Sequence, residues 1–192
     1  MYLEKLRFDG RVALVIGASG GGMGTATSLA LAEAGAQVVG VDLDEERLDA
    51  IRKQVAAIGG KFHGLAANVL ETSQVARVVK TTVDRFGGID CLANVVGGSH
   101  TAGTRPSLRV HEYENEDAYE HMFNLNLRYA IHSSGLVARE MIARGRGGAS
   151  STSHPWRRTP AHRAMRSMQW PRRRWSLSRA RWQANLQRTT SA

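Results

Sequence analysis

The chain has 192 residues, a single cysteine, and no apolar run that approaches the about 18 residues of a membrane span. These features exclude an internal disulfide framework and an integral membrane protein. The N-terminus has no signal-peptide core, and we therefore expect one domain in the cytoplasm. The net charge of +9 is unevenly spread, because residues 150–192 hold ten of the 26 basic residues and none of the 17 acidic ones. All four tryptophans also lie there, so two kinds of sequence meet near Ala149.

Strands and helices alternate through the first part of the chain. An apolar run rich in β-branched residues predicts a buried strand at residues 12–16, and a second buried strand is predicted at residues 37–41. A third and a fourth strand are expected at residues 61–67 and 89–95. Helical spacing of apolar residues predicts helices at residues 25–34, 44–58, 71–86 and 117–144. The second helix is expected to turn one face inward, made by Leu48, Ile51, Val55 and Ile58. This alternation predicts an α/β fold with a doubly wound parallel sheet of strand order 3-2-1-4.

A glycine-rich loop joins the first strand to the first helix. Its glycines are Gly17, Gly20, Gly21, Gly22 and Gly24. Strand, glycine loop and helix in this order form a candidate dinucleotide site, because glycines let the backbone approach a pyrophosphate and the helix start holds negative charge. Asp42 ends the next strand, about 20 residues further on, where a carboxylate can bind ribose hydroxyls. The alternative for the glycine loop is a plain tight turn, and the alternative for Asp42 is a solvated acid at the end of a strand.

An ordered set of motifs resembles the short-chain dehydrogenase/reductase family. The set comprises residues 11–24, Asp42, the pair Asn68-Val69, L-A-N-V-V-G-G at 92–98, and F-N-L-N-L-R at 123–128. The resemblance covers about residues 8–149. It implies a Rossmann fold, a nicotinamide cofactor, and hydride transfer between an alcohol and a carbonyl.

The resemblance implies a cofactor site carried over position by position. Its residues are Gly17, Ser19, Gly20, Gly22, Met23, Gly24, Asp42, Asn68, Val69, Asn94 and Gly97. This chain has one residue more than the family between the first two motif glycines, so the usual contact falls to either Ser19 or Gly20. Asp42 would accept hydrogen bonds from the ribose and repel a 2′-phosphate, which favours NAD over NADP.

Three asparagines receive roles from the same resemblance. Asn68, with Val69, would lie beside the adenine ring, and Asn94 would brace the fourth strand against the cofactor loop. Asn126 is the one catalytic residue of the family found here, where it would bend its helix and hold a water of the proton relay. Asparagine is a poor helix-interior residue, which supports a special role for Asn126.

The family pattern stops after Ala149. A serine and then Tyr-x-x-x-Lys are expected there, the tyrosine as proton donor and the lysine to lower its pKa. Residues 150–192 contain neither tyrosine nor lysine, so we expect the chain to be inactive as it stands. We divide it into a nucleotide-binding domain (1–149) and a basic tail without fixed structure (150–192). The fourth strand should then be an exposed sheet edge, and the domain should be poorly stable and bind NAD weakly.

A frameshift within the Ala149 codon would explain this tail. Read one base out of register, the following residues permit I-V-N-I-S-S directly after the break, and residues 167–172 permit Y-A-M-A-K. Both a strand and a Tyr-x-x-x-Lys helix therefore reappear where the family has them. We accordingly interpret the chain as a truncated relative of an active reductase.

Other functions stay open at this point. The chain could be a non-catalytic nucleotide-binding protein, or the arginines and tryptophans of the tail could bind nucleic acid, although we favour accidental composition for the tail. The family acts on small alcohols or carbonyls and usually forms homodimers or homotetramers, but the pairing helices are incomplete here. The histidines share no metal-ligand spacing, so no metal site is expected.

Overall fold

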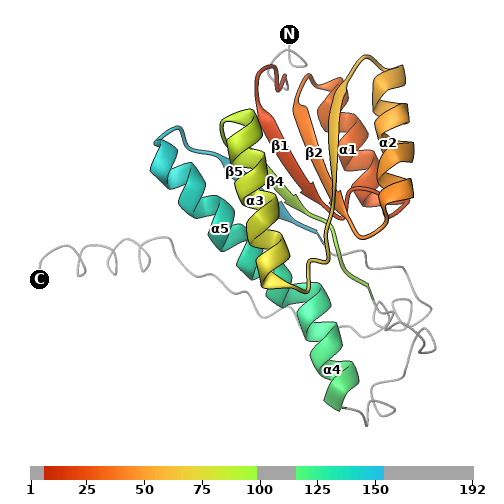
Figure 1. The fold of residues 1–192 in the computed structure, drawn as a ribbon, viewed down its shortest axis with the longest axis vertical. Coiled ribbons are helices and arrows are strands. Elements are labelled where there is room, and N and C mark those ends of the chain that lie inside the picture. Colours follow the sequence, from red (N-terminus) through yellow and green to blue (C-terminus); the bar gives the residue numbers. More distant parts are fainter. Residues whose placement is uncertain (1–6, 99–115, 154–192) are drawn as a thin grey trace, which may run out of the picture. The chain divides into compact units, whose positions relative to one another are not determined.

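A computed structural model of the protein describes residues 7–98 and 116–153, which form one parallel sheet with helices on both faces (Figure 1). The strands are β1 (Val12–Ile16), β2 (Gln37–Asp42), β3 (Lys61–Ala66), β4 (Cys91–Asn94) and β5 (Ala149–Thr152). The helices are α1 (Met23–Glu33), α2 (Glu45–Ala57), α3 (Thr72–Phe86), α4 (Glu116–Phe123) and α5 (Tyr129–Arg144), with a π-helical turn η3 (Asn124–Arg128) before α5. The sheet order is β3-β2-β1-β4-β5, so the predicted α/β class and the order of the first four strands are confirmed.

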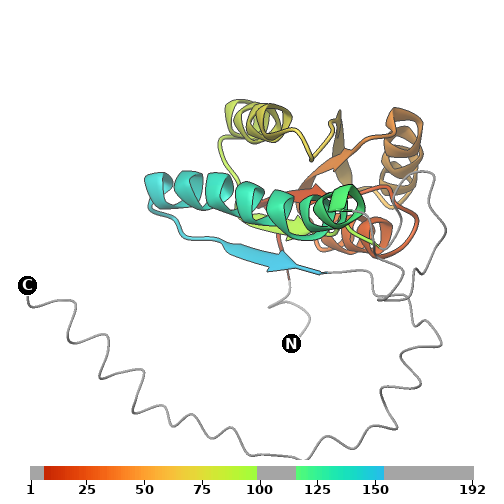
Figure 2. The same cartoon turned by 90° about the horizontal axis from the view of Figure 1, so that it is seen from below.

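The central strand β1 divides the core into two layers. Its five residues are all buried, as expected of a strand covered on both faces. Leu14 and Ile16 belong to the layer under α3 and α5, whereas Ala13 and Val15 belong to the layer under α1 and α2. The period of two along a strand therefore directs alternate side chains to opposite faces of the sheet. Figures 1 and 2 show the two helix pairs on these faces.

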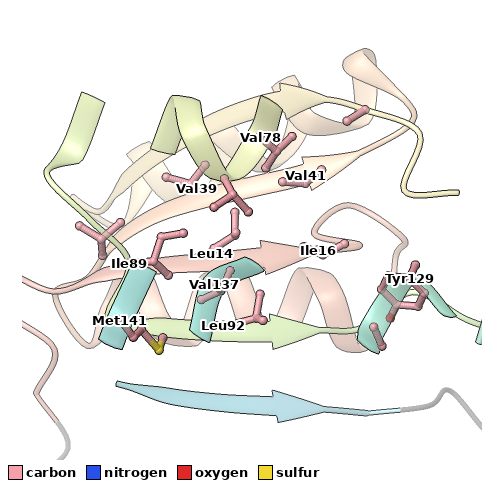
Figure 3. Packing of buried hydrophobic residues seen from close by; sticks show 14 residues of the cluster. Leu14, Ile16, Val39, Val41, Val78, Ile89, Leu92, Tyr129, Val137 and Met141 are labelled. Carbon is pink, nitrogen blue, oxygen red and sulfur yellow. The ribbon is translucent and has the colours of Figure 1, made fainter. Parts of the chain in front are cut away.

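Residues from α3 and α5 meet the sheet in the larger of the two layers (Figure 3). Val78 packs from α3, and Val137 and Met141 pack from α5. Ile89 and Leu92 are fully buried beneath them. This layer holds α5 on one face of the sheet. The turn η3, which precedes α5, thereby lies near the segment that follows β4.

The fifth strand corrects two predictions. Residues 149–152 form β5 and pair in parallel with β4, so the expectation that the fourth strand is an exposed edge is wrong. The boundary after Ala149 also falls inside a strand, while residues 154–192 of the predicted tail lie outside the described residues. All four β5 residues are exposed. The strand is held by backbone hydrogen bonds, from Ala149 N–H to Asp90 O (3.0 Å) and from Ser153 N–H to Asn94 O (2.9 Å), and so needs no apolar side chains.

Two helices differ in detail from the prediction. Ile58, expected on the inward face, is 50% exposed, because α2 ends at Ala57 and Ile58 has left helical geometry. Leu48, Ile51 and Val55 are buried as predicted. The helix predicted over residues 117–144 is present but is interrupted by η3.

Candidate functional site

The glycine loop folds tightly over the carboxyl end of β1. The N–H groups of Gly17 and Ala18 both donate to the carbonyl of Val41, at 2.8 and 3.0 Å. Gly17 has a φ of +89°, and a side chain there would touch Val96 within 3.0 Å. A side chain on Gly24 would collide with the carbonyl oxygen of Gly17. The loop therefore requires glycine at both positions to bring β1, α1 and the segment after β4 together.

The start of α1 is open and rich in unused donors. Its N-cap is Gly22, no side chain caps it, and its first turn carries no acid. A side chain built on Gly20, Gly21 or Gly22 would meet nothing within 4 Å, so this part of the loop borders open space. The hydroxyls of Ser19 and Thr25 are buried without a partner among the described residues. Free N–H groups and hydroxyls at a helix start suit the phosphates of a dinucleotide.

Asp42 reaches back to this loop from the end of β2. One carboxylate oxygen accepts the N–H of Ser19 at 2.9 Å and the other accepts the N–H of Leu43 at 2.8 Å. The side chain is thus fixed beside the glycine loop by two charge-assisted hydrogen bonds. Each carboxylate oxygen keeps further acceptor capacity for a hydroxyl ligand.

Asn68 lies at the next strand end but its side chain is already engaged. Its Oδ1 accepts the N–H of Leu70 at 3.0 Å, and its Nδ2 donates to Glu71 at 3.3 Å. These contacts shape the turn into α3, while the neighbouring Val69 packs partly buried against the core. A side-chain contact from Asn68 to a ligand would have to share or replace them.

The side chain of Asn94 points away from the cofactor loop. Asn94 is 1% exposed; its Nδ2 donates to Ser134 at 3.1 Å and its Oδ1 accepts the hydroxyl of Ser133 at 2.8 Å. The side chain therefore braces β4 against α5, with a weaker contact to Thr152 of β5 at 3.4 Å. The expected link to the cofactor loop is made instead by the backbone, from Val95 N–H to Ile16 O at 2.8 Å.

Asn126 joins the turn η3 to the glycine segment that follows β4. Its Oδ1 accepts the N–H of Gly98 at 2.9 Å, and its Nδ2 donates to Gly98 O at 3.0 Å and to Met122 O at 2.8 Å. Both amide protons are used within the chain, so only Oδ1 of this side chain has room for a further donor. The helix widens into a π turn at this asparagine, where the resemblance implies a bend.

The comparison with known families decides the identity of the fold. The family model described as short chain dehydrogenase matches residues 11–152, through the end of β5. The chain belongs to the short-chain dehydrogenases. These are oxidoreductases with a Rossmann-like sheet that bind nicotinamide cofactors.

Curated relatives and solved structures agree with this assignment. The chain is 32% identical over 148 residues to 3-oxoacyl-(acyl-carrier-protein) reductase of Thermotoga maritima, and 34% identical over 148 residues to 2-dehydro-3-deoxy-D-gluconate 5-dehydrogenase of Dickeya dadantii. Each match covers 77% of this chain and 57% or 54% of the relative, so the chain spans about half the length of these relatives.

Two solved structures show the same fold. A 7α-hydroxysteroid dehydrogenase complexed with NADH and 7-oxo glycochenodeoxycholic acid has a TM-score of 0.68 at 27% identity, covering 78% of this chain and 55% of its own. A short-chain type dehydrogenase/reductase from Mycobacterium marinum has a TM-score of 0.71 at 26% identity, covering 79% and 58%.

The structure of this short-chain dehydrogenase adds residues that the sequence analysis missed. Tyr129 is 2% exposed and donates its hydroxyl to Val96 O at 2.8 Å, and burial raises its pKa to about 12. Ser133 and Ser134 hold Asn94 from α5. Tyr129 and Ser133 are four residues apart, on the face that also carries Val137 and Met141, so helical spacing from the buried apolar positions could have found both.

The described part of this short-chain dehydrogenase contains no helix that is long and apolar enough to cross a membrane.

Proposed function

We propose that the chain binds a nicotinamide dinucleotide at the carboxyl edge of its sheet, prefers NAD to NADP, and does not carry out hydride transfer at an enzymatic rate in this form. The position of Asp42 carries the proposal, because its carboxylate is fixed 2.9 Å from the N–H of Ser19 in the glycine loop. A carboxylate there binds a free ribose diol and repels a 2′-phosphate.

The glycine loop and the start of α1 are the proposed phosphate site. Gly17 and Gly24 permit the close packing that shapes it, and Gly20 and Gly22 border open space that a phosphate can enter. The unpartnered hydroxyl of Ser19 and the open N–H groups of the helix start supply donors. Met23, 40% exposed at the first position of α1, is proposed to pack against the cofactor.

The neighbouring strand ends complete the proposed site. Asn68 and Val69 would border the adenine ring, while Gly97 follows β4 and lies next to Gly98, which Asn126 holds. Asn94 contributes by fixing β4 and α5 relative to each other. Asn126 is proposed to position the segment after β4 and to offer its remaining Oδ1 lone pair to a water.

The missing proton donor is the reason for the proposed inactivity. When bound, a nicotinamide ring supplies or accepts the hydride, and the family resemblance assigns the accompanying proton to a tyrosine helped by a lysine. Residues 150–192 offer neither. Tyr129 does not substitute, because its hydroxyl is buried, is bonded to Val96 O, and has a pKa of about 12.

Calorimetric titration with NAD and NADP tests the cofactor proposal. We expect weak binding of NAD and weaker binding of NADP, and Asp42→Asn should weaken NAD binding by about tenfold while narrowing the difference from NADP. Asp44→Asn is the matched control, since it removes the same charge two residues away, where Asp44 caps α2. Equal affinities for both cofactors, or equal effects of the two variants, would contradict the proposal.

The frameshift proposal is tested in the gene and in the assay. The sequence around the Ala149 codon should show a lost base, and restoring the frame should give a longer chain that reduces small carbonyl compounds with NADH. The 192-residue chain should show no turnover above background in the same assay. Ordinary enzymatic turnover by the 192-residue chain would refute the proposed inactivity without touching the cofactor proposal.

A further inference from the structure

We propose that a cavity at the amino edge of the sheet is a second ligand site, which binds a small phosphate-bearing anion. The cavity has a volume of about 350 Å³ and is lined by residues of β2, α2, β3 and α3. This volume lies at the lower end of the about 300–1,000 Å³ that is usual for small-molecule sites. It would hold a phosphorylated small molecule rather than a macromolecule.

The cavity is separate from the dinucleotide site. Gln37 and Lys61, the first residues of β2 and β3, line it, whereas Asp42 ends β2 at the opposite edge. The six residues of β2 place the two edges roughly 15–20 Å apart. A ligand in this cavity would therefore bind independently of the glycine loop.

The charge of the lining selects an anion. Three cationic side chains, Arg52, Lys61 and Arg85, line the cavity, and no lining residue is acidic. Arg52 is paired with Asp49 at 2.9 Å, while among the described residues no carboxylate lies within ion-pair distance of Lys61 or Arg85. Two cations beside one cavity, neither with an ion-pair partner in the described part of the chain, favour a doubly charged ligand such as a phosphate.

Helix termini alone do not account for this arrangement. Cations are common in the last turn of a helix, and Arg85 has that position in α3. Lys61, however, begins a strand, and Arg52 lies in the middle of α2, whose last turn has no basic residue. The three cationic residues come from three elements, and all of them line the cavity.

The aromatic wall adds a neutral donor. His63 stands edge-on to Phe86 with ring centroids 5.7 Å apart, and the Arg85 guanidinium lies 5.7 Å from the centre of the same ring. Burial, with a smaller contribution from the charge of Arg85, lowers the pKa of His63, so its imidazole is neutral near pH 7. A neutral imidazole can donate to a phosphate oxygen while Phe86 covers the apolar part of the ligand.

Titration of the 192-residue chain with inorganic pyrophosphate at constant ionic strength tests the proposal, with backbone amide NMR shifts as the readout. The location of the shifts matters, because the glycine loop and the ten arginines after Ala149 can also attract this probe. We expect saturable shifts at residues 60–63 and 85–86. The double variant Lys61→Gln, Arg85→Gln should weaken this binding at least tenfold.

Two further variants make the result decisive. Lys53→Gln removes an exposed charge next to Arg52 on α2 but outside the lining, and should leave the shifts at residues 60–63 unchanged. Ala56→Glu adds a carboxylate to the lining at an exposed helical position, and should weaken binding without removing any group of the cavity. The proposal is overturned if pyrophosphate does not shift the amide signals of residues 60–63 and 85–86. It is also overturned if these signals shift equally in the Lys53 variant and in the double variant.

Discussion

Gly24 shows how one residue can decide the shape of the candidate site. It is the second residue of α1, and in most helices alanine is favoured over glycine by about 1 kcal/mol. Here a β-carbon would collide with the carbonyl oxygen of Gly17. We therefore predict that Gly24→Ala lowers the free energy of unfolding by about 2–4 kcal/mol, against the helix propensity.

Gly20→Ala provides the control for this prediction. A β-carbon on Gly20 meets nothing within 4 Å, and its backbone is not in the left-handed region. Its free energy of unfolding should stay within about 0.5 kcal/mol of the parent. Urea unfolding followed by circular dichroism measures both, and a Gly24→Ala protein as stable as the parent would show that the loop is not closely packed.

Tyr129 should make stability depend on pH in the alkaline range. Its folded pKa is raised to about 12 from an ordinary value near 10, mainly by burial. The folded state therefore binds the proton more tightly, and this contribution is complete below pH 10 and is lost as the pH rises to 12. Two pKa units correspond to about 2.7 kcal/mol.

Tyr129→Phe isolates this effect from the other groups that titrate at high pH. At pH 7 the free energy of unfolding of the variant should be about 1 kcal/mol lower than that of the parent, because the Val96 carbonyl loses its hydrogen-bond donor. Between pH 10 and 12 the parent should lose more stability than the variant, and urea unfolding at each pH gives the difference. Parallel pH curves for the two proteins would mean that the Tyr129 hydroxyl is not buried.

At the scale of elements, Asn126 ties η3 to the segment after β4. Asn126→Ala would leave Gly98 N–H, Gly98 O and Met122 O without the side-chain amide. The loss of three hydrogen bonds is expected to lower the free energy of unfolding by about 2 kcal/mol and to speed hydrogen exchange at the Gly98 amide.

Asn124→Ala is the matched control in the same turn. Among the described residues, the side chain of Asn124 makes a single contact, which it accepts from exposed Arg128 at 3.4 Å. We expect the free energy of unfolding to change by less than about 0.5 kcal/mol and hydrogen exchange at the Gly98 amide to stay the same. Similar exchange rates at Gly98 in the two variants would contradict the joining role of Asn126.

The elements that the sequence predicts well are those with a buried side-chain pattern. The five residues of β1 are all apolar and three of them are β-branched, as suits a strand covered on both faces, and this run is visible in the sequence. β5 has no such pattern, because its alanine, serines and threonine are all exposed and its order comes from backbone bonds to β4. A side-chain pattern cannot reveal a strand of that kind.

The candidate site likewise has features that the sequence predicts and features that it does not. The family resemblance implies that Asn126 bends its helix, poor helix propensity supports a special role for it, and the structure has a π turn there. The side chain of Asn94 is expected at the cofactor loop but contacts α5 instead. Alternation along β4 places it on the same face as Leu92, under α5. The internal hydrogen bonds of Asn68 depend on the turn into α3, which spacing alone does not describe.

At the scale of the whole molecule, an apolar stripe is left uncovered on α4 and η3. Tyr119, Phe123 and Leu127 are 67%, 45% and 42% exposed and recur every four residues, which places them on one side of the helix. Exposed apolar side chains in a row favour association, and short-chain dehydrogenases are typically oligomeric. We therefore predict that this stripe promotes self-association of the chain.

Phe123→Glu should therefore weaken self-association at least tenfold, because a carboxylate in the middle of the stripe would have to be buried without a partner. Sedimentation velocity over a range of concentrations measures the change. Ile58→Glu is the control, since Ile58 is also exposed (50%) but lies beyond the end of α2 on another part of the domain. A parent chain that stays monomeric at every concentration would show that the stripe alone is too small to pair two copies, and an equal effect of both variants would place the contact elsewhere.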